Sequence, residues 1–154
     1  MIVVADTSPL TALISVGSVE ILPKLFNRII IPPAVWDELL AGHSTLPSWI
    51  EVTPVQHPEL AVRFAAQVDR GEAEAIELAK ELKADRLLID DMKGRRLAES
   101  EGLPIIGLLG VILIAKRSGI IPSARILLDE LDCKAGIYLA SNLVESALKS
   151  IGEQ

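Results

Sequence analysis

Acidic side chains stand at four separate places in the sequence, each where an apolar run ends or a helix is expected to begin. Carboxylates at the carboxyl ends of buried parallel strands point into the crevice where α/β proteins bind ligands. Several carboxylates in one crevice repel one another unless a divalent cation neutralises them. The spacing therefore predicts a metal site built from distant parts of the chain. Its candidate ligands are Asp6, Glu38, Glu72, Glu74, Asp90 and Asp91.

A site made only of carboxylate oxygens favours Mg²⁺ or Mn²⁺, which keep several waters and accept a substrate phosphate as a further ligand. The sequence contains neither a G-x-x-x-x-G-K-[ST] nor a G-x-G-x-x-G loop, and no nucleophilic Ser or Cys motif with a partner His. The single cysteine, Cys133, excludes an internal disulfide and a cysteine-based zinc site. Metal-assisted chemistry on a phosphate is the reaction that these residues favour.

Each acid also has a purely structural explanation. Asp6 and Asp90 stand where Asp commonly caps a helix, and Glu72 and Glu74 suit the first turn of one. Successive helical residues point about 100° apart. Glu72 and Glu74 are two residues apart, so they point about 200° apart and cannot both face one site. The end of a strand favours Asp90 over its neighbour Asp91 as the residue in the crevice. The joint pattern favours a site over the separate structural explanations.

Strands and helices must alternate to bring these acids together. Short apolar runs rich in β-branched residues predict strands, and segments of helical period lie between them. The predicted strands are 2–5, 28–31, 49–55, 86–89 and 103–106. The predicted helices begin after Asp6 and cover 18–25, 34–41, 59–68, 72–82, 93–100, 107–117, 123–131 and 137–151. The pattern predicts a three-layer α/β/α fold with a short central parallel sheet.

Length and composition agree with one domain over residues 1–154, with a helical hairpin at about 122–151. Half of the residues are apolar and only 3% are aromatic, so Leu, Ile, Val and Ala must fill the core. The longest apolar stretch, 103–115, is broken by Pro104 and two glycines and is too short for a membrane span. Because the chain runs from Met1 straight into strand residues, without a signal-peptide pattern, we expect a cytoplasmic protein.

The formal net charge is −6, which speaks against a broad basic surface for nucleic acid. A bound cation would change the local field, however, and three basic residues follow the Asp pair closely. They are Lys93, Arg95 and Arg96.

Four motifs together resemble a known family. They are Asp6-Thr7-Ser8, the Pro-x-x-Val-x-x-Glu that ends at Glu38, Gly71-Glu-Ala-Glu-Ala-Ile, and the Leu-Leu-Ile-Asp-Asp that ends at Asp91. The chain resembles PIN domains over nearly its whole length, most of all the VapC-like toxin ribonucleases and PIN proteins of the DUF3368 type. The stretch 87–121 is the most specific part of the resemblance.

The resemblance implies a metal-dependent endoribonuclease, commonly the toxin of a toxin–antitoxin pair. The family's acids map onto Asp6, Glu38, Glu74 and the pair Asp90-Asp91, and Ser8 falls where relatives often carry a hydroxyl. The chain departs from the pattern at three places. Relatives usually have Asp where Glu74 stands, Thr-x-Asp where Ile89-Asp90-Asp91 stands, and often Thr where Leu108 stands. The alignment of Thr-x-Asp with Ile89-Asp90-Asp91 places the family's acid at Asp91 and so favours Asp91 over Asp90 as the ligand.

On this interpretation the acids hold one or two Mg²⁺ or Mn²⁺ ions that activate water against an RNA phosphodiester. Lys93, Arg95 and Arg96 are expected to guide the RNA backbone, unless they form a solvated helix face. We expect an antitoxin to cover the acids, with an Arg or Lys among them, and a homodimer to cover surplus apolar helical surface. The alternatives are an inactive module that binds RNA or protein, and a metal-dependent phosphatase, although Asp6-Thr7-Ser8 lacks the second acid usual in that class.

Overall fold

The computed structural model describes residues 1–137 and 139–153. Within them, five strands form one parallel sheet in the order β3-β2-β1-β4-β5. The strands are β1 (Ile2–Ala5), β2 (Arg28–Ile31), β3 (Ile50–Val52), β4 (Arg86–Leu88) and β5 (Ile105–Ile106). From the central β1 the chain first builds β2 and β3 on one side and then β4 and β5 on the other. The strand order therefore reverses between β1 and β4, which is where open α/β sheets bind ligands.

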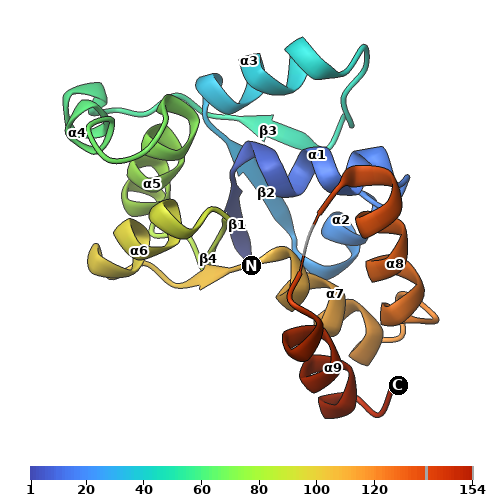
Figure 1. The fold of residues 1–154 in the computed structure, drawn as a ribbon. Coiled ribbons are helices and arrows are strands. Elements are labelled where there is room, and N and C mark those ends of the chain that lie inside the picture. The colour runs from blue at the N-terminus through green and yellow to red at the C-terminus, as the bar shows by residue number, and fades with distance from the viewer. Residues whose placement is uncertain (138, 154) are drawn as a thin grey trace.

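Helices cover both faces of this sheet (Figure 1). On one side lie α4 (Pro58–Phe64), α5 (Arg70–Leu82) and α6 (Met92–Ser100). The core of the other side is built with α1 (Thr7–Ser15), α2 (Ile21–Leu25), α3 (Pro33–Gly42), α7 (Leu108–Arg117), α8 (Ala124–Ala135) and α9 (Ser141–Ser150). The predicted three-layer α/β/α fold is confirmed.

The alternation of side chains along the strands explains the two layers. Val3 and Ala5 of β1 point into the core with α1 and α7, whereas Val4 points into the core with α5 and α6. All three are completely buried. A strand with both faces covered is apolar at every position. This is why β1 has no polar residue until it ends at Asp6.

The clearest difference from the sequence expectations is in the C-terminal part. A helix was expected from residue 137, but α9 begins at Ser141 and residues 137, 139 and 140 are not helical; Tyr138 lies outside the described residues. Gly136 adopts the left-handed conformation, with φ of 65°, that commonly ends a helix, and so it terminates α8. Farther on, Glu153 accepts hydrogen bonds from the backbone of Ala124 at 2.9 Å and Arg125 at 3.0 Å, which ties the C-terminal segment to the start of α8.

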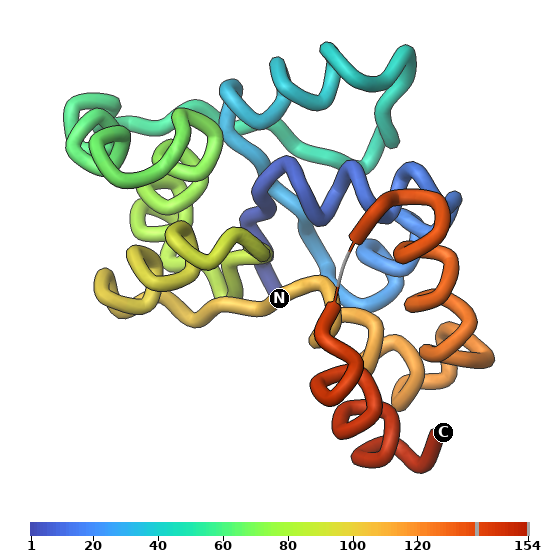
Figure 2. Tube along the Cα trace, in the orientation of Figure 1, coloured from blue at the N-terminus to red at the C-terminus, as the bar shows by residue number. Residues whose placement is uncertain are grey.

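The C-terminal helices α8 and α9 lie at the opposite side of the molecule from α4 and α6 (Figure 2). None of the helices that the structure describes is both long and apolar enough to cross a membrane.

Candidate functional site

Asp6 is the buried centre of the candidate site. It follows β1, is only 3% exposed, and is joined to β4 by a 2.9 Å hydrogen bond from its backbone N–H to the carbonyl of Leu88. Although it is the N-cap residue of α1, its side chain makes no capping hydrogen bond. Burial, together with the charges of neighbouring acids, raises the pKa of Asp6 to about 7, despite a hydrogen bond from the backbone of Thr7. The simple capping explanation therefore does not account for this carboxylate.

Glu72 is the second buried acid. It lies in the first turn of α5, is 6% exposed, and takes part in a capping box with Asp69. Its Oε2 accepts from the backbone N–H of Asp69 at 3.2 Å, while Asp69 Oδ1 accepts from the backbone of Glu72 at 2.8 Å. Burial raises the pKa of Glu72 to about 7, and the charges of Asp69, Asp91 and Glu38 add to the rise. A carboxylate with such neighbours favours a proton or a cation.

Three exposed acids surround these two. Glu38 extends from α3, Asp69 precedes α5, and Asp91 precedes α6, where its Oδ2 accepts from the backbone of Gly94 at 3.1 Å. Burial of its carboxyl group raises the pKa of Glu38, and the charge of Asp69 raises it further, while Thr7 and Arg70 oppose the rise. We call the five residues the acidic cluster; they are Asp6, Glu38, Asp69, Glu72 and Asp91.

The positive ends of three helices lie at the acidic cluster. Asp6, Asp69 and Asp91 are the N-cap residues of α1, α5 and α6. The partial positive charge of a helix N-terminus stabilises nearby carboxylates. Capping hydrogen bonds give Asp69 and Asp91 a structural role as well. Asp6 makes no such capping hydrogen bond, so the structural role of the other two N-cap residues does not extend to it.

Glu74 lies outside the acidic cluster. Its Oε1 accepts from the backbone N–H of Ala34, at the start of α3, at 3.2 Å, and its Oε2 pairs with Arg70 at 3.0 Å. The two alternatives from the sequence are therefore separated in the structure. Glu72 lies among the acids, and Glu74 joins α5 to α3.

Asp90 and Asp91 are separated in the same way. Asp90 Oδ1 accepts from the backbone of Leu108, the first residue of α7, at 3.0 Å. Burial of its carboxyl raises the pKa of Asp90, although Leu108 and Arg95 both oppose the rise. Arg95 itself donates to the carbonyl of Ile89 at 2.8 Å. Asp90 and Arg95 thus connect β4, α6 and α7, whereas Asp91 is the member of the pair that raises the pKa of Glu72.

Of the residues predicted to bind substrate, Lys93 and Arg96 lie together, and Ser8 lies on another helix. Lys93 and Arg96 are exposed on α6 and line a cleft of about 490 Å³ with Gln67, which precedes α5. Ser8 is exposed in the first turn of α1. The hydroxyl of its neighbour Thr7 is buried close to Glu38, without a partner in hydrogen-bonding geometry among the described residues.

The donor set of the acidic cluster suits a hard divalent cation, because all of its side-chain donors are carboxylate oxygens. No ion pair found among the described residues includes a member of the cluster. Within the same part of the chain, however, no three His, Cys, Asp or Glu side chains are arranged so that they could hold a metal ion. The acids are gathered but do not converge on one point.

Asp69 was missed by the sequence analysis. It raises the pKa of Asp6, Glu38 and Glu72, so it is central to the acidic cluster. The signal that would have found it is Asp-x-x-Glu, from Asp69 to Glu72, which is the pattern of a capping box before a helix.

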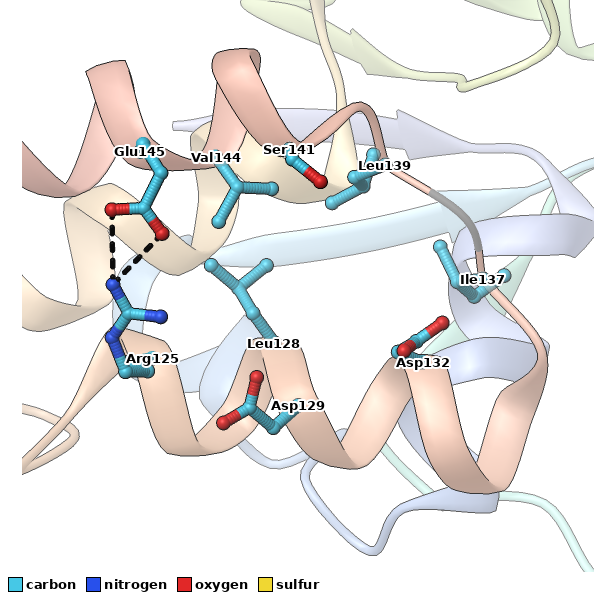
Figure 3. A pocket seen from close by; sticks show the side chains of 9 residues that line it. All are labelled: Arg125, Leu128, Asp129, Asp132, Ile137, Leu139, Ser141, Val144 and Glu145. Atoms are coloured by element: carbon cyan, nitrogen blue, oxygen red, sulfur yellow. Dashed lines mark hydrogen bonds and ion pairs between the residues drawn. The ribbon is translucent and has the colours of Figure 1, made fainter.

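A separate hollow lies between α8 and α9 (Figure 3). It has a volume of about 240 Å³, and the ion pair of Arg125 and Glu145 at 3.0 Å stands at one end. Leu128 and Val144 face each other across it. None of the acids predicted from the sequence lines this hollow.

A three-layer α/β/α fold with carboxylates at the reversal of strand order is that of an α/β protein whose acidic crevice lies where such sheets bind ligands. A family model described as a PIN domain, DUF3368, matches residues 2–153, and the chain belongs to this family. PIN domains are generally nucleases, and they typically use divalent metals. No protein of curated function matches the chain significantly.

Proposed function

We propose that the protein is a metal-dependent endoribonuclease whose site is the acidic cluster. The observation that carries the proposal is the burial of Asp6 and Glu72 beside three further carboxylates at the reversal of strand order. Burying charges of one sign is unfavourable without compensation, so a fold that retains this arrangement requires a cation or protons there.

Asp6, Glu38, Glu72 and Asp91 are the residues that would hold Mg²⁺ or Mn²⁺. When bound, the ion would supply a nucleophilic water at neutral pH and stabilise charge on the phosphodiester. Asp69 fixes Glu72 through the capping box and adds negative charge. Because the pKa of Asp6 and of Glu72 is about 7, either carboxylate can also take up a proton near neutral pH.

RNA is the substrate that we propose, and Lys93 and Arg96 are its backbone contacts. They lie three residues apart on α6, so they project on one face of the helix, and this helix begins directly after Asp91. Cations at this spacing can contact phosphates beside the site while the rest of the acidic surface repels RNA. Arg95 takes no part, because it holds Ile89 and Asp90. Ser8 is available at the rim as an exposed hydroxyl.

The biological setting that we propose is a VapC-like toxin with a protein antitoxin. An antitoxin that placed an Arg or Lys among the acids would neutralise the same charges that a metal would. A homodimer is also proposed; Ile126 on α8 and Leu143 on α9 are large apolar side chains exposed by 59% and 51%.

Cleavage of single-stranded RNA with added Mg²⁺ or Mn²⁺ tests the enzymatic proposal. We expect wild-type protein to cut and Asp6→Asn to lose activity, because the variant removes the buried charge and keeps the shape. Asp129→Asn on α8 is the matched control and should cut normally. Full activity of Asp6→Asn would refute the proposal.

A catalytically weak module that binds RNA or protein is the second candidate. The specific observation in its favour is that no three acids of the described residues converge to hold an ion. RNA binding without cleavage at saturating Mn²⁺ would support this candidate over the enzyme.

A further inference from the structure

A row of acids on α5 holds backbone N–H groups of two other segments. Glu74, Glu77 and Glu81 follow one another at spacings of three and four residues, so they share one helix face. Glu74 accepts from Ala34 at the start of α3. Glu81 accepts from the backbone of Gln56 at 2.7 Å and of His57 at 3.0 Å, directly before α4. This face of α5 therefore anchors the beginnings of α3 and α4.

Glu77 lies between these two anchors and differs from both. It is 2% exposed, and its Oε1 has no hydrogen-bond partner in the part of the chain that the structure describes. Glu81 lies four residues on, on the same face of α5, and its carboxyl group acts on the pKa of Glu77. A buried carboxylate beside a second carboxylate is normally neutralised by a proton.

We propose that Glu77 holds a proton below neutral pH and shares it with Glu81, so that the two acids form a pH-sensitive latch between α5 and residues 56–57. Burial and the contact with Glu81 raise the pKa of Glu77 to about 7. Burial also acts on Glu81, but hydrogen bonds from Gln56, Glu77 and His57 bring its pKa below the ordinary value. Glu77 thus carries the proton and Glu81 the charge.

The other charged groups around the pair oppose the latch only weakly. Lys80 and His57 favour the charged form of Glu77. Lys80 is paired with Glu101, at 2.6 Å, and lies over the ring of Phe64. His57 Nδ1 is 3.2 Å from Glu59, which is the partner of that ring.

Loss of the proton has a structural consequence. Above about pH 7 two charged carboxylates would lie close together, and their repulsion would push the carboxylate of Glu81 away from that of Glu77. The hydrogen bonds of Glu81 to Gln56 and His57 should weaken, which releases the segment before α4. This inference is independent of metal binding and of nuclease activity.

Amide proton shifts of Gln56 and His57, followed by NMR on the full chain from about pH 5 to about pH 9, test the latch. In wild-type protein both should move upfield together with a midpoint near pH 7, as their bonds to Glu81 weaken. Glu77→Gln keeps a donor toward Glu81 at every pH. In this variant the amide proton shifts of Gln56 and His57 should therefore show no transition near pH 7.

His57 carries an imidazole beside the pair and is the necessary control. His57→Asn keeps the backbone N–H of residue 57, and the transition should survive in this variant. A transition that persists in Glu77→Gln and vanishes in His57→Asn would overturn the latch. A wild-type protein without any transition would overturn it as well.

Discussion

Glu38 Oε1 occupies the space beside Gly71 into which any side chain would project, 2.2 Å from the position that a Cβ would take. The absence of a side chain at the second residue of α5 therefore allows an acid of α3 to reach the acidic cluster. Asp69 Oδ1 lies on the same side, 3.5 Å from that position. The site therefore requires glycine at position 71, to leave room for Glu38, whereas the helix does not require it.

Gly71→Ala should separate function from stability. The atom that must move is the end of a flexible side chain, and Ala favours helix over Gly by up to about 1 kcal/mol, so the melting temperature should hold or rise. Displacement of Glu38 should weaken Mn²⁺ binding by at least about tenfold, or ~1.4 kcal/mol. Thermal unfolding and calorimetry check this. Weakened folding with unchanged metal binding would contradict the spacing role.

Glu72→Gln and Glu74→Gln form a matched pair on one helix. We expect Glu72→Gln to lose RNA cleavage, because it removes a buried charge from the acidic cluster. Glu74→Gln keeps an acceptor for Ala34 and loses only the ion pair with Arg70, whose side chain is 72% exposed, so it should cut normally and lose less than about 1 kcal/mol of stability. The assay is initial cleavage rate with melting temperature. The reverse ranking would restore Glu74 as the ligand.

Asp90→Asn and Asp91→Asn separate the second pair of acids. Asn preserves an acceptor in both places, for Leu108 in one case and for Gly94 in the other. Both variants should fold, and we expect only Asp91→Asn to bind Mn²⁺ more weakly, by about tenfold or more. Equal loss in the two variants would show that the whole pair serves the site.

The raised pKa values of Asp6 and Glu72 imply a defined dependence on pH. Both values are about 7, above the ordinary 3.8 and 4.5, so between these limits the folded chain binds more protons than the unfolded chain. Their contribution to stability is therefore greatest below about pH 4 and is lost as the pH rises toward 7. Metal binding must displace these protons, so Mn²⁺ affinity should rise from about pH 6 to about pH 8. Melting curves of the Asp6→Asn, Glu72→Gln double variant should show a flatter pH dependence; an unaltered dependence would assign it to other groups.

Lys93→Glu with Arg96→Glu should weaken binding of single-stranded RNA and reduce its salt dependence, because two phosphate contacts are lost. Arg117→Glu, at the end of α7, makes the same charge change as either single substitution, but on another helix, and is the control for each. Fluorescence anisotropy at several salt concentrations measures both. If all three substitutions act alike, net charge and not the cleft at α6 governs binding.

The fold was predictable because its signals are local. The β-branched run at 2–5 becomes β1 with the same bounds, since a strand covered on both faces has to be apolar throughout. The family followed from motifs spread over the chain, and the match over residues 2–153 confirms it. The start of α9 was not predictable, because Ile137, Leu139 and Ala140 extend a helical pattern in the sequence but are not helical in the structure.

The choice between neighbouring acids was not predictable, because it depends on tertiary partners. Helical geometry showed that Glu72 and Glu74 face different ways, but only the start of α3 gives Glu74 its partner. Likewise, the start of α7 decides the direction of Asp90. Asp69 was overlooked because the helix was expected to begin at residue 72, whereas α5 begins at Arg70 and takes Asp69 as its N-cap residue.

Titration of Mn²⁺ into wild-type protein and Asp6→Asn at about pH 8, followed by calorimetry, tests the central claim most directly. At this pH both buried acids are charged. We expect saturable binding to the wild type and a loss of at least about tenfold in affinity in Asp6→Asn, with Asp129→Asn unchanged. Equal binding by wild-type protein and Asp6→Asn, or no binding to either, would contradict a metal site at the acidic cluster.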